Sequence, residues 1–137
     1  MANDCCTAGG ISLLYTCGGA SDVGELSDLA VRKLWKEGFA TKTCLAGVGA
    51  DISGFVQSAK GADVNIVVDG CPLACARKCL ERIGVSPVSV MLADIGFKKG
   101  ASPITEENIE KVVAAIKEAS AKHLTQPAAV TEGGCCS

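Results

Sequence analysis

Nine cysteines in 137 residues dominate the chemistry that this sequence could perform. Three of them stand at the ends of apolar, strand-like segments: Cys17, Cys44 and Cys71. Zinc and other soft metal ions prefer thiolate ligands, and four thiolates in a tetrahedron complete a structural zinc site. In a reducing compartment, so many cysteines indicate metal binding, redox chemistry or catalysis rather than a disulfide framework. The odd number also disfavours complete intramolecular pairing, so metal ligation is the leading hypothesis.

Cys75 is the candidate fourth ligand. Pro72 is expected to be the first residue of a helix, which places Cys71 at its N-cap and Cys75 one turn later on the same side. The Cα rise between the two cysteines would be about 6 Å, which their side chains can close onto one ion. Cys79 would lie about 12 Å along the axis from Cys71. It is interpreted as a packing residue, and becomes a candidate ligand only if the helix begins elsewhere.

Two vicinal cysteine pairs lie near the chain ends. They are Cys5-Cys6 and Cys135-Cys136, the second preceded by two glycines that give it reach. Adjacent thiols can capture a soft ion such as mercury, arsenite, copper(I) or zinc, or fold back over a core site. The alternative is that each pair lies in an unstructured tail and merely oxidises, and the sequence leaves both interpretations open.

The elements that must position these cysteines alternate between strand-like and helix-like patterns. Strands are expected at 11–16, 39–45, 64–68 and 88–93, and helices at 22–37 behind an N-cap at Ser21, at 53–60, at 72–83 and after a cap at Thr105. This order implies right-handed crossovers and a mainly parallel sheet of about four strands. The predicted fold is a single-domain, three-layer α/β/α architecture of the Rossmann or flavodoxin-like kind, with the strand order left open.

This architecture gives the cysteines a common location. In an open α/β sheet, ligands bind outside the carboxyl ends of the strands. Cys17, Cys44 and Cys71 are each expected there, with Cys75 one helical turn beyond. The sequence therefore predicts a shared metal site at this edge of the sheet.

Composition and charge limit the domain organisation and the partners. The domain is expected at 11–124, between mobile tails at 1–10 and 125–137 that are small, polar and rich in Gly or Pro. A net charge of −2 without any basic run disfavours nucleic acid. No apolar stretch approaches the roughly 20 residues of a membrane span, and the start lacks a secretory signal, so a cytoplasmic protein without a membrane partner is expected.

Three other residues could take part in chemistry. Cys71 and Arg77 have the spacing of a cysteine phosphatase loop, but Pro72 removes one N–H donor, so chance is the preferred explanation. Asp69 is interpreted as a cap or supporting hydrogen-bond acceptor rather than a ligand. His123 is the only histidine, so no Cys–His–carboxylate triad is expected.

The stretch DGCPLACARKCL at 69–80 resembles the motif that names the DGC-domain family, whose members are regarded as zinc-binding proteins. The resemblance continues in YTCGGASDVG at 15–24 and TCLAGVG at 43–49, and it covers about 11–117 in order. It implies a small bacterial or archaeal-type domain whose shared cysteines bind metal. By position these are Cys17, Cys44, Cys71 and Cys75; the terminal pairs lie outside the family core.

The predicted function is the binding of a soft metal ion, zinc first, for storage, sensing or delivery without turnover. The partners would be the metal ion and a metal donor or acceptor protein. One alternative is thiol redox or sulfur transfer, in which Cys71 attacks and Cys75 or a tail cysteine resolves. Another is an iron–sulfur cluster on the same cysteines.

Overall fold

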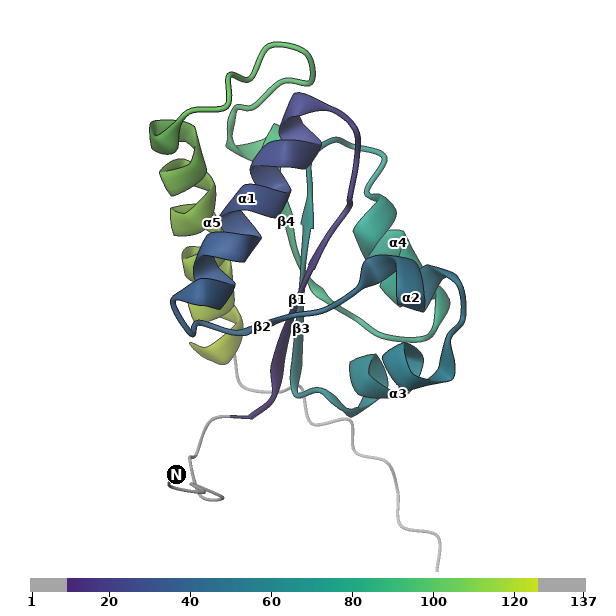
Figure 1. The fold of residues 1–137 in the computed structure, drawn as a ribbon. Coiled ribbons are helices and arrows are strands. Elements are labelled where there is room, and N and C mark those ends of the chain that lie inside the picture. Colours follow the sequence, from purple (N-terminus) through teal and green to yellow (C-terminus); the bar gives the residue numbers. More distant parts are fainter. Residues whose placement is uncertain (1–9, 126–137) are drawn as a thin grey trace, which may run out of the picture.

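The computed structural model describes residues 10–125. The terminal pairs Cys5-Cys6 and Cys135-Cys136 lie outside the described residues, so their predicted roles stay predictions. Four parallel strands form one sheet in the order β2-β1-β3-β4 (Figure 1). The strands are β1 (Ser12–Thr16), β2 (Thr41–Lys42), β3 (Val64–Asp69) and β4 (Val88–Met91).

Helices cover both faces of this sheet. α1 (Asp22–Lys36) and α5 (Glu106–Thr125) pack side by side on one face, and α2 (Leu45–Gly49), α3 (Ser53–Gly61) and α4 (Cys75–Arg82) lie on the other (Figure 1). A short 3-10 helix, η1 (Leu92–Ile95), follows β4. The three-layer α/β fold predicted from the alternating pattern is therefore confirmed. None of the helices in the described part of the chain is both long and apolar enough to cross a membrane.

Alternation along the central strands divides the core into two layers. Leu14, Ile66 and Val68 pack with α1 and α5, whereas their neighbours Tyr15 and Val67 pack with the helices of the other face. Successive strand side chains point to opposite faces, so both faces receive apolar side chains because the central strands carry apolar residues at consecutive positions, 13–15 and 66–68. The register of β1 on β3, with Thr16 opposite Val68, brings the carboxyl ends of these two strands level.

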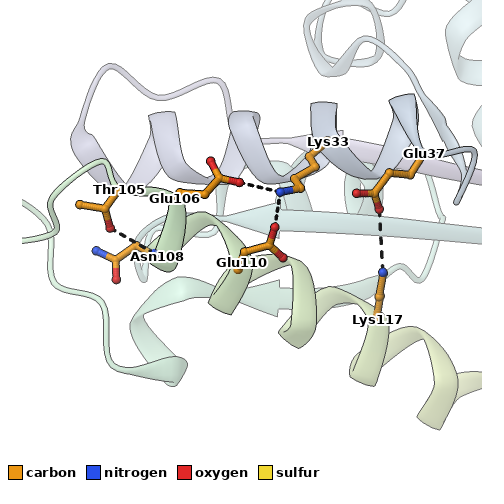
Figure 2. Close-up of polar contacts among 7 residues, drawn as sticks. All are labelled: Lys33, Glu37, Thr105, Glu106, Asn108, Glu110 and Lys117. Atoms are coloured by element: carbon orange, nitrogen blue, oxygen red, sulfur yellow. Dashed lines mark hydrogen bonds and ion pairs between the residues drawn. The ribbon is translucent and has the colours of Figure 1, made fainter.

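Ion pairs join α1 to α5 at the surface of their contact. Figure 2 shows Lys33 between Glu106, at 2.6 Å, and Glu110. Lys117 reaches back to Glu37 at 3.9 Å. Hydrogen bonds to Glu106 and Glu110 hold the pKa of Lys33 above its usual range.

The start of α5 is capped as the sequence predicted. The N–H of Asn108 donates to the Thr105 hydroxyl at 3.2 Å, also drawn in Figure 2.

Three predicted boundaries were wrong. The strand expected at 39–45 contracts to two residues, because Cys44 caps α2, a glycine-containing helix that the sequence did not predict. The strand expected at 88–93 ends at Met91, where η1 begins. The helix expected from Pro72 begins instead at Cys75, because a turn with a left-handed residue, Ala74, comes between.

Candidate functional site

The carboxyl ends of β1 and β3 form the topological switch point of the sheet. β1 connects through α1 to β2 on one side, and β3 connects through α4 to β4 on the other. Ligands of open α/β folds bind in the crevice at such a point. A pocket of about 350 Å³ lies here, and three of the four predicted ligands line it: Cys17, Cys71 and Cys75.

Cys17 and Cys71 approach the pocket from the two faces of the sheet. The N–H of Cys17 donates to the carbonyl of Val68 at 3.1 Å, which continues the pairing of β1 with β3 by one residue. The half-buried side chain of Cys17 packs toward the layer of α2, α3 and α4, and that of Cys71 toward the layer of α1 and α5. Both thiols are therefore fixed to the rigid end of the sheet.

A non-helical β-turn, rather than one turn of the α-helix, separates Cys71 from Cys75. The N–H of Ala74 donates to the carbonyl of Cys71 at 3.1 Å, and Ala74 has φ 51° and ψ 47°. An alanine in this left-handed region costs roughly 1–2 kcal/mol. The predicted N-cap position of Cys71 is therefore wrong. Cys75, whose side chain is exposed, is the first residue of α4.

Asp69 holds the start of α4 in place. Its carboxylate is 1% exposed and accepts hydrogen bonds from the N–H of Ala76 at 2.8 Å and of Arg77 at 3.1 Å. The supporting role predicted for Asp69 is confirmed. Because its oxygens occupy two N–H donors that an oxyanion loop would use, the phosphatase-like spacing of Cys71 and Arg77 forms no such loop. The Nε of Arg77 instead lies 3.6 Å from Glu81.

Backbone contacts bring the wall of the pocket close to α1. A Cβ on Gly24 would collide with the carbonyl of Gly19, and a Cβ on Gly70 would lie 2.8 Å from the backbone carbon of Val23. Only glycine permits such approaches. The loop after Cys17, the turn before Cys71 and the first turn of α1 are thus in direct backbone contact.

The other two candidate cysteines do not line this pocket. Cys44 is exposed and caps α2, where its Sγ accepts a hydrogen bond from the N–H of Gly47 at 3.4 Å. Its expected place at the end of a strand is wrong, and its role as the fourth ligand stays a prediction. Cys79 is half-buried on α4, beside Gly49 of α2. Across residues 10–125, no three Cys, His, Asp or Glu side chains are grouped closely enough to hold a metal ion as they stand.

The structure also brings in a residue that the sequence did not single out. Lys99, from the loop between η1 and α5, lines the same pocket as the three thiols. The neighbouring Gly100 indicated a turn at this point, but no local pattern connects residue 99 with residue 17 or 71. His123, in contrast, lines a different pocket, at the amino ends of β3 and β4.

Comparison with known proteins identifies the family. The profile of the DGC domain matches residues 13–116. A relative in Pseudomonas aeruginosa strain PAO1, "Anaerobic and virulence modulator AnvM", is 40% identical over 91 residues, which are 65% of this chain and 69% of the relative. No solved structure matches the chain significantly. With its family motifs at 15–24, 43–49 and 69–80 and a profile match over most of its length, the chain belongs to the DGC domain family.

Proposed function

We propose that this DGC domain binds a soft metal ion, zinc first, through Cys17, Cys71 and Cys75, for sensing or delivery without turnover. The observation that supports the proposal most is that thiols from two segments distant in sequence, one after β1 and the other between β3 and the start of α4, line one pocket at the switch point of the sheet. A structural cysteine can occupy any buried position. Three thiols at the place where this fold builds its ligand sites favour a common ligand.

The pocket suits a soft ion better than a hard one. Its three thiols offer sulfur ligands, whereas Asp69, the one carboxylate that residues 10–125 contribute to the lining, has both oxygens engaged by the N–H groups of α4. Zinc takes thiolates at about 2.3 Å, so binding requires the thiols to turn inward. Cys75 is exposed and therefore free to change rotamer. Cys44 would complete a tetrahedron only after leaving its hydrogen bond to Gly47.

The name of the relative describes a modulator and names no reaction. In this proposal the domain works in the cytoplasm and exchanges its metal with a donor or acceptor protein. Neither nucleic acid nor a membrane is part of it.

The test is metal content. The full chain would be purified anaerobically, and zinc per chain measured by mass spectrometry for the wild type and for Cys17→Ser, Cys71→Ser and Cys75→Ser. We expect about one zinc per chain in the wild type and clearly less in each variant, because even the loss of an outer-shell partner costs about 10–100-fold in metal affinity. Cys79→Ser is the matched control, because it removes a thiol from the same helix as Cys75 but outside the pocket. A metal-free wild type, or full zinc in all three variants, overturns the proposal.

Cys44→Ser decides the number of ligands. If Cys44 completes a tetrahedron, its serine variant loses zinc as the pocket variants do. If the variant keeps its zinc, the site has three protein ligands.

Thiol redox chemistry is the second candidate, because Cys71 and Cys75 line the same pocket and Cys75 is exposed. A metal-free protein that forms a reversible Cys71–Cys75 disulfide would favour it. An iron–sulfur cluster would show itself by a brown colour in the anaerobic preparation, whereas a zinc protein is colourless.

A further inference from the structure

The loop between η1 and α5 has a defined shape around Lys99. The N–H of Ala101 donates to the carbonyl of Lys98 at 3.0 Å, and Gly100 has φ 84°. Lys99 and Gly100 are thus the two central residues of a β-turn with the glycine in the left-handed region, as in a type II turn. Ser102 closes the loop, since its hydroxyl accepts the N–H of Lys98 at 2.9 Å and donates to the carbonyl of the same residue at 2.7 Å.

Asp22 ties this turn to the wall of the thiol pocket. Its carboxylate accepts the N–H of Gly100 at 2.9 Å and the N–H of Ser102 at 2.8 Å. These hydrogen bonds lower the pKa of Asp22, with Gly100 the larger cause. Asp22 is the first residue of α1 and directly follows Ser21, which itself lines the pocket. The loop is therefore anchored next to the thiols, and Lys99 stands at the tip of the anchored turn.

The charges around the pocket are unequal. Of the residues that the structure describes, two charged ones line it, Asp69 and Lys99. Asp69 is buried and each of its oxygens accepts a hydrogen bond from the start of α4, so its charge is compensated within the fold. Lys99 is exposed and is the one cationic side chain in the lining among residues 10–125. Ser21 adds a neutral donor, because its Oγ accepts the N–H of Gly24 at 3.3 Å and keeps its own hydrogen to donate.

We infer that Lys99 and Ser21 form an anion-binding position beside the three thiols, which takes the carboxylate of a small thiol that carries the metal. The inference rests on the proposed function for the identity of the cargo. A divalent ion on three thiolates already has a net charge of −1, so a further anion needs a cation beside it, and among residues 10–125 Lys99 is the cation in the lining. With Cys44 outside the pocket, the sulfur of the small thiol supplies a further ligand while its carboxylate pairs with Lys99.

The first experiment measures the electrostatics without any metal. The reduced, metal-free chain would be alkylated with anionic iodoacetate and with neutral iodoacetamide, and the rate at each pocket cysteine followed by mass spectrometry. The ratio of the two rates on one thiol removes the effect of its own reactivity. We expect Lys99→Met to lower the iodoacetate-to-iodoacetamide ratio roughly twofold to fivefold, the order expected for the loss of one unit charge within a few Å in water. About 1 M salt should abolish the difference.

Lys98→Met is the matched control, since Lys98 precedes Lys99 in the same turn but does not line the pocket. The iodoacetate-to-iodoacetamide ratio of Lys98→Met should equal that of the wild type. Lys99→Arg, which keeps the positive charge, should have a ratio close to that of the wild type. Equal ratios for Lys98→Met and Lys99→Met overturn the inference, whether or not the protein binds metal. Melting temperatures of all variants exclude a general loss of folding.

The second experiment tests the cargo. Zinc would be offered as its complex with thioglycolate, which is anionic, or with neutral 2-mercaptoethanol, and the rate of uptake compared. The wild type should take zinc faster from the anionic complex, and Lys99→Met should lose that preference while it still binds zinc. Uptake at equal rates from both complexes by the wild type would contradict the inference and leave the metal-binding proposal standing. Failure to take zinc from either complex would contradict the proposal itself.

Discussion

The face of the sheet under α1 and α5 and the thiol pocket at its carboxyl end are built by different interactions. The face is an apolar layer in which Leu26, Leu34 and Ile116 are fully buried, with ion pairs only at its surface (Figure 2). The pocket is shaped by hydrogen bonds between carboxylate side chains and backbone N–H groups: Asp69 holds the start of α4, and Asp22 anchors the loop that carries Lys99, while Ala74 takes a left-handed backbone conformation. The comparison teaches that stability and chemistry are located in separate parts of this domain.

The largest effect is expected in the apolar face. Leu26→Ala removes a fully buried side chain and should lower the free energy of unfolding by about 2–5 kcal/mol, as measured by urea denaturation. The zinc content per folded molecule should not change. Cys75→Ser in the metal-free protein should barely change the free energy of unfolding, because the side chain of Cys75 is exposed. If the two variants lose similar stability, the separation of the two regions is wrong.

A smaller effect, on both the free energy of unfolding and the zinc affinity, is expected at Asp69. In Asp69→Asn, one carboxylate oxygen becomes an NH₂ group that faces an N–H donor of α4. The free energy of unfolding should fall by about 1–3 kcal/mol, because a buried donor loses its acceptor. Zinc affinity should fall as well, since α4 begins with Cys75.

Asp94→Asn, at an exposed carboxylate, is the control and should change neither quantity. An Asp69→Asn variant of unchanged stability and affinity would show that Asp69 does not hold α4.

The smallest effect is expected at Ala74. Ala74→Gly removes the cost of a left-handed alanine but gives the unfolded chain more conformational freedom, and the two effects oppose each other. The free energy of unfolding should therefore rise by no more than about 1 kcal/mol. The same substitution two residues later, Ala76→Gly, lies inside α4 and should destabilise by about 1 kcal/mol or more. Thermal melts of the two variants check the contrast. Equal destabilisation would mean that the turn before α4 stores no strain.

The apolar face could be predicted from the sequence because its determinants are local. The runs at 11–16 and 64–68 and the helical spacing after Ser21 and Thr105 each fix an element without reference to the rest of the chain. The positions of Cys17 and Cys71 followed from those strands, since each cysteine comes directly after a strand end or two residues beyond it.

The remainder of the site depends on contacts between distant residues. The start of α4 is decided by Asp69, whose carboxylate accepts the N–H of Ala76 seven residues later. The preference of proline for the first position of a helix takes no account of such a contact. α2 forms although glycines disfavour helix, because the ring of Phe55 fills the space beside Gly47. Lys99 reaches the pocket only through Asp22, 78 residues before Gly100.

The backbone contacts of Gly24 and Gly70 have a mechanical consequence. α1 has 15 residues and is therefore a stiff rod of about 22 Å, with its first turn in contact with the chain on either side of the thiol pocket. Near its far end stands Trp35, half-exposed and the only tryptophan of the sequence. Trp35 and the wall of the thiol pocket are thus joined by one continuous helix, so the fluorescence of Trp35 is a signal to record while metal is added to the domain.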